Sequence, residues 1–397
     1  MDLQITDEQR AIVANIRRFI EQEIIPLENE ELDQDAFSLP PHHRERLQNI
    51  VKEMGFWRIE APVEYGGGGQ TLDLKTRVFM AEQMSQHRAG LYSPCYGVFG
   101  RGGAAPQLYA GTEKQKERYL YPVLRGEKSS FLGITEPSGG SDPARAIQTK
   151  GVRDGDDWVI NGGKIFNSGA DTADFGLVFV RTDPTRGRQG ITCFLIDTDT
   201  PGFRVQRLVH VLRSHYTTEL TFDDMRVPHE NILGEEGGGF AIANENLSRN
   251  RVPYSAACNG VAIAAQRMAV EYSRHRVTFG EPLASRQAIQ WMLVDNEIDI
   301  RTSRWLCLDA AQKADDEKPY RFEASMAKVY GTEAAGRVVD RCIQIHGGYG
   351  VTKDLPLERW YRELRIRRIG EGPSEVQRII MARDLTSGTV LAGAMPE

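Results

Sequence analysis

The sequence is poor in cysteine, in long apolar runs and in excess positive charge. Its five cysteines are scattered and form no CxxC pair, which argues against a disulfide framework or a zinc site and favours reduced thiols in a cytoplasm-like compartment. No apolar run approaches the roughly 18 residues that a membrane span requires. The opening residues, MDLQITDEQR, are acidic and polar, so we expect neither a signal peptide nor a transit peptide. These absences predict a cytoplasmic protein without a membrane span.

The charge balance also excludes one class of partner. The chain has 49 Lys and Arg residues against 55 Asp and Glu residues, a net charge of −6. It therefore has no overall positive field that would attract nucleic acid or an anionic membrane surface. Apolar residues make up 40% and charged residues 26% of the 397 positions, which is typical of a globular protein with two or three domains.

The first part of the chain, residues 1–128, is predicted to be helical. Thr6 and Gln9 form a capping-box pattern, apolar residues follow at helical spacing, and Pro26 is expected to end this first helix.

The second part, residues 129–235, contains short β-prone runs. Asp154-Gly155 and Asn161-Gly162 are dipeptides typical of tight hairpin turns, so we expect a small antiparallel β-domain, a barrel or a sandwich.

The third part, residues 236–397, returns to long helices. Apolar residues recur every three or four positions over 260–276, 287–314 and 322–345. Their lengths and order predict an antiparallel bundle, which makes the whole chain an α+β multidomain protein.

Two motifs carry the functional signal. The first is TEPSGGSD at 135–142, a predicted strand end that breaks into a glycine-rich turn. The second is RRIGEGPSEVQR at 367–378, where Glu371 lies between Gly370 and Gly372. Glycine on both sides lets the backbone approach a ligand closely. Together, and in this order, the motifs resemble the signatures of the acyl-CoA dehydrogenase family, and the resemblance extends over nearly the whole chain. It implies a helical N-terminal domain, a middle β-domain and a C-terminal four-helix bundle.

The resemblance also implies a set of contacts to FAD. The corresponding residues are Leu132, Ile134, Thr135, Ser141, Phe166, Asn167, Ser168, Arg276, Thr278, Phe279, Gln287, Gln344, Ile345, Gly347, Gly348, Pro373, Ser374 and Glu375. In the family the residue matching Arg276 reaches the cofactor of a neighbouring subunit, and a guanidinium fork suits a pyrophosphate. Phe166 stands where the family usually has tryptophan, Asn167 is a polar departure, and Pro373 lacks the family's threonine hydroxyl.

Glu371 is the implied catalytic base. Removing the C2 proton of an acyl thioester while hydride leaves C3 for flavin N5 gives the trans-2-enoyl-CoA, and a buried carboxylate with a raised pKa suits this task. Asn250 matches the position at which some members carry the base, and an amide cannot accept the proton. The alternative is that Glu371 only forms ion pairs with Arg365, Arg367 or Arg368. His346 has no nucleophile or metal-spaced partner, so we expect it to pack in a loop.

The resemblance further implies the substrate and partners. Ser141, Ser248, Arg251 and Gly372 correspond to substrate-binding positions, with Arg251 on the CoA portion. We expect a homotetramer, a dimer of dimers, that passes electrons to an electron-transfer flavoprotein. Two alternatives remain: a flavin oxidase or monooxygenase of the same fold that uses oxygen, and a non-catalytic scaffold that binds acyl-CoA or FAD.

Two residues bear on the acyl group. Many straight-chain members carry tyrosine where this chain has Gly370, so either the pocket is open to branched, cyclic or bulky acyl groups, or another residue fills the space. Arg101, in a glycine-rich segment, is either a contact to a polar acyl tail or an exposed loop arginine.

Overall fold

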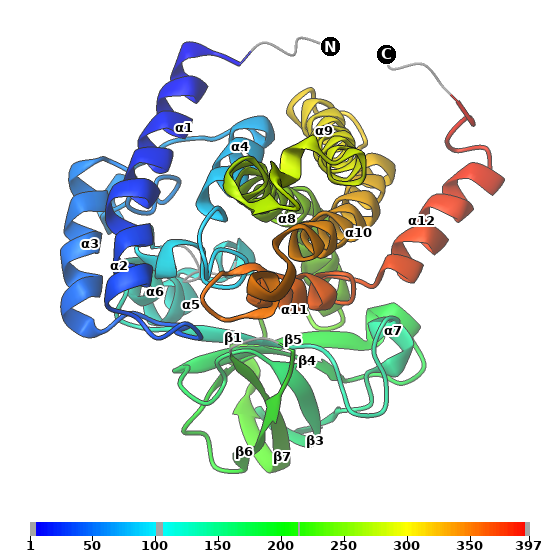
Figure 1. The fold of residues 1–397 in the computed structure, drawn as a ribbon. Coiled ribbons are helices and arrows are strands. Elements are labelled where there is room, and N and C mark those ends of the chain that lie inside the picture. Colours follow the sequence, from blue (N-terminus) through cyan, green and yellow to red (C-terminus); the bar gives the residue numbers. More distant parts are fainter. Residues whose placement is uncertain (1–4, 101–105, 213–214, 394–397) are drawn as a thin grey trace.

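The computed structural model describes residues 5–100, 106–212 and 215–393, and Arg101 lies outside these ranges. The N-terminal helices, in blue and cyan, and the C-terminal helices, in yellow to red, lie together above a central sheet domain in green (Figure 1). This confirms the predicted order of a helical, a β and a second helical part.

The N-terminal part is built from short helices around an apolar core that includes Ile16, Phe19 and Leu47. Its α-helices are α1 (Asp7–Phe19), α2 (Ile25–Glu30), α3 (Pro41–Glu53), α4 (Leu74–Met84), α5 (Glu113–Gln115) and α6 (Tyr121–Arg125). The capping box of Thr6 and Gln9 at the start of α1 is confirmed. The expected end at Pro26 is wrong, because a π-helical turn over Ile20–Ile24 leads directly into α2, whose first turn tolerates a proline.

The middle part is a mixed sheet rather than the purely antiparallel one that we expected. Its strands are β1 (Ser130–Gly133), β2 (Lys150–Asp154), β3 (Asp157–Asn167), β4 (Phe175–Arg181), β5 (Ile191–Asp197), β6 (Phe203–His210) and β7 (Tyr216–Pro228), with a short helix α7 (Pro143–Ala146) after β1. The order is β1-β4-β2-β3-β7-β6, with β5 paired to β4. Both β1 and β2 pair with β4 in parallel, which requires a long crossover. The chain makes it through the β2–β3 hairpin between β1 and β4, and through β3 between β2 and β4.

The two predicted hairpin turns have different outcomes. Asp154-Gly155 lies in the tight turn between β2 and β3, as predicted. Asn161-Gly162 is not a turn: it lies inside β3, where the register with β7 shifts. Gly162 has φ 144°, and a Cβ there would come within 2.7 Å of Thr149 Cα, so this glycine serves a bulge and a close approach.

The C-terminal part contains three long helices and two shorter ones. They are α8 (Gly239–His275), α9 (Gln287–Asp315), α10 (Arg321–His346), α11 (Leu357–Arg367) and α12 (Ser374–Thr386). The ends of α9 and α10 agree with the sequence within one or two residues, whereas α8 begins well before residue 260 and runs through Pro253. The N-terminal helix α4 packs against α8 and α9, which ties the two helical parts together.

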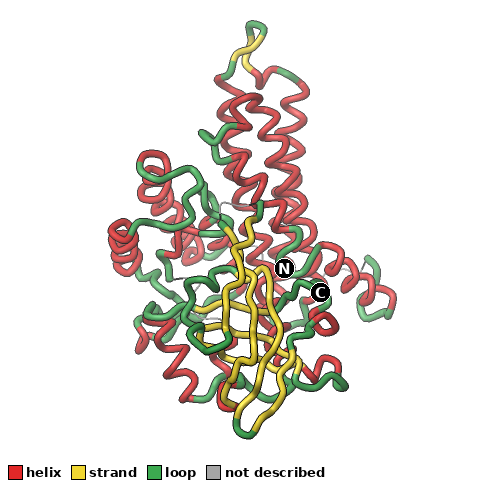
Figure 2. Tube along the Cα trace, turned by 90° about the horizontal axis from the view of Figure 1, so that it is seen from below, coloured by secondary structure: helices red, strands yellow, loops and turns green. Residues whose placement is uncertain are grey.

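A two-stranded hairpin joins α8 to α9. Its strands, β8 (Val277–Thr278) and β9 (Glu281–Pro282), form a sheet of their own. The hairpin lies at the far tip of the bundle, whereas the large sheet lies at the opposite end (Figure 2). Within one chain, the two ends of the bundle are therefore well separated.

Candidate active site

Glu371 lies on a tight turn between α11 and α12. Its backbone adopts φ 55° and that of Gly372 adopts φ 85°, both in the left-handed region. The turn is closed by the Ser374 N–H, which donates to the Arg368 carbonyl at 3.0 Å. A non-glycine residue in this conformation costs free energy and tends to occur where function requires a particular side-chain direction.

A buried lysine on α10 donates two hydrogen bonds to this turn. Lys328 Nζ donates to the carbonyl oxygens of Gly372 at 2.8 Å and Arg368 at 3.2 Å, on either side of Glu371. The residue is fully buried, and this burial lowers the pKa of Lys328 to about 8. Our sequence analysis missed Lys328. Its position between Ala327 and Val329, on a run of small apolar residues, is the signal that could have revealed it.

The Glu371 carboxylate is poorly solvated. Its Oε2 atom is buried and has no hydrogen-bond partner among the described residues. Burial raises the pKa of Glu371 above its ordinary value, although Arg367, Arg251 and Lys328 each lower it in part. No ion pair within 4 Å joins Glu371 to another residue of the described ranges, so the alternative of a solvated glutamate–arginine cluster finds no support.

Besides Lys328, two arginines place positive charge near Glu371. Arg251 lies on α8, is 5% exposed, and its Nε atom has no hydrogen-bond partner in the part of the chain that is described. Arg367 is the last residue of α11 and is also buried. Ser248 lies in a stretch of α8 whose side chains fall outside those the structure describes.

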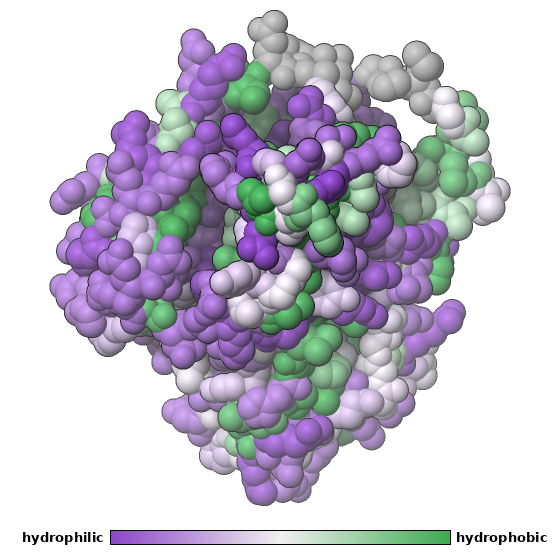
Figure 3. All heavy atoms as spheres, viewed as in Figure 1, coloured by the Kyte–Doolittle hydropathy of each residue, from purple (hydrophilic) through white to green (hydrophobic). Residues whose placement is uncertain are grey.

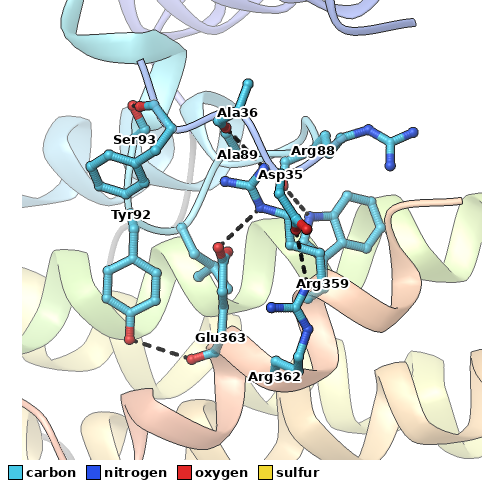
Figure 4. A network of polar contacts seen from close by, with 12 residues as sticks. Asp35, Ala36, Arg88, Ala89, Tyr92, Ser93, Arg359, Arg362 and Glu363 are labelled. Atoms are coloured by element: carbon cyan, nitrogen blue, oxygen red, sulfur yellow. Dashed lines mark hydrogen bonds and ion pairs between the residues drawn. The ribbon is translucent and has the colours of Figure 1, made fainter. Parts of the chain in front are cut away.

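Helix α11, which leads into the Glu371 turn, is fixed to the N-terminal part by a network of polar contacts (Figure 4). Arg359 pairs with Glu363 at 3.0 Å and donates to the Ala36 carbonyl at 3.0 Å. Trp360 Nε1 donates to the Arg88 carbonyl at 3.1 Å. The position of the glutamate therefore depends on contacts between segments more than 250 residues apart.

Gly370 lies next to the hydroxyl group of Tyr254. A Cβ at this position would come within 2.8 Å of the Tyr254 hydroxyl oxygen. Of the two expectations for Gly370, the structure thus favours the second, in which another residue occupies the space that a side chain at 370 would take.

The predicted FAD residues of the β-domain come together at the ends of β1 and β3. The Ile165 N–H donates to the Thr135 carbonyl at 2.8 Å, which joins the TEPSGGSD segment to the end of β3. Phe166 is 56% exposed and has φ 62°, so it is not the core aromatic that an ordinary strand would carry. Ser141, also with positive φ, is exposed in the same motif. An exposed aromatic face beside a glycine-rich turn fits a planar, polar-edged ring system.

Two motif residues have structural partners. Glu136 is buried and accepts hydrogen bonds from Lys164 Nζ at 2.7 Å and from the Gln148 and Thr149 N–H groups. This pair, which sequence reasoning missed, anchors the loop. Asn167 is buried, and its amide donates to the Thr218 carbonyl at 3.2 Å. Its side chain thus points into the sheet and away from the surface that carries Phe166.

Of the remaining predicted FAD residues, Pro373, Ser374 and Glu375 follow Glu371 at the start of α12, whereas the others lie at the other end of the bundle. Arg276 and Gln287 are exposed, and Phe279 at the tip of the β8–β9 hairpin is 98% exposed with φ 50°. Gln344, Gly347 and Gly348 at the end of α10 are also exposed. His346 is buried, stacks on Tyr272 with ring centroids 4.5 Å apart and contacts the Cys342 carbonyl. It packs as expected, but as the last residue of α10 and not in a loop. One chain therefore does not bring the two groups of FAD residues together (Figure 2).

The five cysteines are all free and buried, as expected for core thiols. No helix within the described ranges has both the length and the apolar character needed to cross a bilayer.

Comparison with known proteins follows the same three-part division. Residues 6–127, 132–225 and 237–386 match the models of the acyl-CoA dehydrogenase N-terminal, middle and C-terminal domains. A short-chain-specific acyl-CoA dehydrogenase of Clostridium acetobutylicum is 35% identical, over 96% of this chain and 99% of that protein. The structure of butyryl-CoA dehydrogenase from Megasphaera elsdenii is 34% identical with a TM-score of 0.82, covering 97% of this chain and all of that one. A structure titled as electron transferring flavoprotein of Acidaminococcus fermentans is 35% identical with a TM-score of 0.83, covering 97% and 99% of the two chains.

Proposed function

Because the chain belongs to the acyl-CoA dehydrogenase family, whose members are oxidoreductases with FAD as cofactor, we propose that Glu371 is the base that removes the C2 proton of an acyl-CoA. The product is the trans-2-enoyl-CoA. The observation that supports this role most directly is the buried Oε2 of Glu371, which has no hydrogen-bond partner among the residues described. A carboxylate kept free of partners at a strained turn is available to accept a proton from a substrate.

The surrounding residues supply what a base needs. Lys328 fixes the turn, and the α11 network fixes the direction from which the turn is reached. The cations Arg251, Lys328 and Arg367 favour negative charge in this region, including the charge that develops on the thioester oxygen when the C2 proton leaves. FAD, when bound, supplies the acceptor for the hydride from C3. Arg251, Ser141 and Gly372 are proposed to contact the CoA thioester.

The residues fit FAD only if two chains contribute. Phe166 and the TEPSGGSD turn would hold the flavin end, and the family-matched Arg276, Phe279 and Gln344 lie at the distant tip of the bundle. We therefore propose that the tip of one chain completes the cofactor site of another, in a homotetramer. Helix α9 supports assembly, since Trp291, Val294 and Ile298 are all more than half exposed on it. The face shown in Figure 3 is mostly hydrophilic, with apolar patches over the sheet domain and the near end of the bundle.

An electron-transfer flavoprotein is the proposed acceptor of the electrons. The similarity to a structure titled as such a flavoprotein of Acidaminococcus fermentans supports this choice. The buried free thiols support a reducing compartment such as the cytoplasm.

The proposal is tested by mixing the FAD-loaded enzyme with a panel of acyl-CoA thioesters without oxygen. We expect the flavin absorbance to bleach, and mass analysis to show loss of two hydrogens from the acyl group. Peroxide formation in air at the rate of turnover would indicate an oxidase instead. A flavin that no thioester reduces would indicate a binding scaffold.

Replacing Arg276 with alanine should weaken FAD retention about tenfold or more, because one charge-assisted contact to the diphosphate is lost. Equilibrium dialysis of FAD against the variant measures this. Arg274→Ala, two residues away on the exposed end of α8, is the matched control and should retain FAD as the parent does. Equal retention by both variants would remove Arg276 from the cofactor site.

Replacing Lys328 with methionine should lower kcat about tenfold, because the carbonyls of Gly372 and Arg368 lose their donor and the turn no longer holds Glu371 in one position. Steady-state kinetics with the best acyl-CoA measures the effect, with the exposed Lys318→Met as control. A variant that melts at a lower temperature but turns over at the parent rate would give Lys328 a purely structural role.

A further inference from the structure

One buried charge beside the active site forms no ion pair with any of the described residues. Arg367 is 7% exposed, and its guanidinium lies between the rings of Tyr92 and Tyr254, 4.3 and 4.2 Å from their centroids. It donates one hydrogen bond, to the Leu91 carbonyl, while its Nε atom is buried without a hydrogen-bond partner in the described ranges. No carboxylate of the described residues lies within 4 Å of it.

Another buried arginine of α11 does have a carboxylate partner. Arg359, about two turns earlier on the same helix and fully buried, is paired with Glu363 at 3.0 Å and donates to two carbonyls. Burying a guanidinium without an anion is costly, and the two tyrosine rings offset only part of that cost. A ligand carboxylate would supply the missing anion, because the planar guanidinium fork suits carboxylate geometry.

The charges around Glu371 also favour an anionic ligand. Three buried or largely buried cations, Arg251, Lys328 and Arg367, act on one carboxylate. Under the proposed function, Arg251 serves the CoA portion, and Lys328 is engaged with the two carbonyls of the turn. Arg367 acts on Glu371 only from a distance, and no carboxylate of the described residues lies close enough to form an ion pair with it.

The position of Arg367 brings it, through Tyr254, next to the turn that carries Glu371. It contacts Tyr254, whose hydroxyl oxygen stands 2.8 Å from where a Cβ of Gly370 would lie, next to Glu371. Because residue 370 has no side chain, nothing from that residue separates the tyrosine–arginine stack from the base.

We propose that the acyl group of the substrate carries a second carboxylate, at the end remote from the thioester, and that Arg367 binds it. This inference rests on the proposed function and narrows its substrate class to CoA thioesters of dicarboxylic acids. Tyr92 and Tyr254 hold the guanidinium plane, which leaves the Nε edge available for a carboxylate oxygen.

The test compares thioesters of equal carbon number that differ only in the terminal group: glutaryl-CoA against pentanoyl-CoA, and adipyl-CoA against hexanoyl-CoA. The readout is kcat/KM for anaerobic flavin reduction by the FAD-loaded enzyme. We expect the parent enzyme to prefer one of the dicarboxylic thioesters at least tenfold over its methyl-ended partner. Arg367→Gln should lower this ratio at least tenfold, and Arg367→Lys, which keeps the charge but not the fork, should retain part of it.

The ratio isolates the carboxylate contact, because a changed pKa of Glu371 would alter both thioesters of a pair alike. Arg365→Gln, an exposed arginine on the same helix, is the matched control and should leave the ratio unchanged. If Arg367→Gln fails to fold, the kcat/KM ratio of the parent enzyme for dicarboxylic over methyl-ended thioesters still tests the inference.

A parent enzyme that reduces its flavin with both pentanoyl-CoA and hexanoyl-CoA at least as efficiently as with their dicarboxylic partners overturns the inference and leaves the proposed function intact. Equal losses on both members of a pair in Arg367→Gln overturn it as well, and assign the arginine to packing or to tuning the base. Failure of every thioester to reduce the flavin overturns the proposed function itself.

Discussion

Replacing Glu371 with glutamine is expected to lower kcat by roughly 10²- to 10⁴-fold, the range that a positioned proton-transfer group usually contributes. The amide has nearly the same shape, so the turn held by Lys328 and the FAD contacts should remain. Anaerobic stopped-flow measurement of flavin bleaching gives the rate, and the visible spectrum of the purified variant reports FAD content.

A matched control is available in Glu317→Gln. Glu317 also adopts a positive φ, of 56°, but it is exposed in the loop between α9 and α10. This variant should bleach at the parent rate. Bleaching at the parent rate by Glu371→Gln would instead move the base elsewhere, with Glu375 on the first turn of α12 the next carboxylate to examine.

The pH dependence of the same step follows from the burial of Glu371. The base must be ionised, and burial raises the pKa of Glu371 above its ordinary value. Activity should therefore be high at alkaline pH and decline as pH falls through this raised pKa, above the pH at which an exposed glutamate would titrate. In the folded state the ionised carboxylate is disfavoured, so Glu371→Gln should stabilise the protein at neutral pH and not at low pH, where the carboxyl is protonated in both states.

Installing tyrosine at Gly370 is expected to reduce kcat/KM about 10²-fold for every acyl-CoA tested. A Cβ there would lie 2.8 Å from the Tyr254 hydroxyl, so the new ring must displace Tyr254 and, with it, the Arg367 guanidinium next to the base. Displacements of about 1 Å near reacting groups cost activity on this scale.

A second substitution that makes room for the new tyrosine ring tests whether the clash with Tyr254 causes the loss of activity. Adding Tyr254→Val to Gly370→Tyr should recover much of the loss, because one aromatic ring then replaces the other. Steady-state kinetics with a short straight-chain and a branched acyl-CoA would show this. A large loss on the branched substrate alone would return support to an open pocket at Gly370, and no recovery in the double variant would point to backbone strain in the turn.

The sequence predicted the features that depend on local patterns. The glycines around Glu371, the Thr6 capping box and the periodicity of α9 and α10 are local, and the structure shows each of them. Predictions were wrong where tertiary context decides. Pro26 continues a helix because it lies in a first turn, and Asn161-Gly162 serves a bulge because β7 pairs along both sides of it.

The polar anchors of the site were not predictable for a related reason. Lys328 meets its two carbonyl partners 40 and 44 residues away, and Glu136 meets Lys164 across 28 residues. Nothing in a single sequence records which distant groups a buried lysine will satisfy. The parallel pairing of β1 with β4 depends likewise on a crossover that strand propensity does not encode.

The hairpin at the tip of the bundle, with Phe279 almost wholly exposed and distant from the sheet, has a thermodynamic consequence under the proposed assembly. A cofactor held jointly by two chains makes binding and association a single linked equilibrium. FAD then strengthens the contact between subunits by the same factor by which association strengthens FAD binding. Dilution alone would release cofactor, so the fraction of active enzyme would depend on its own concentration as well as on that of FAD.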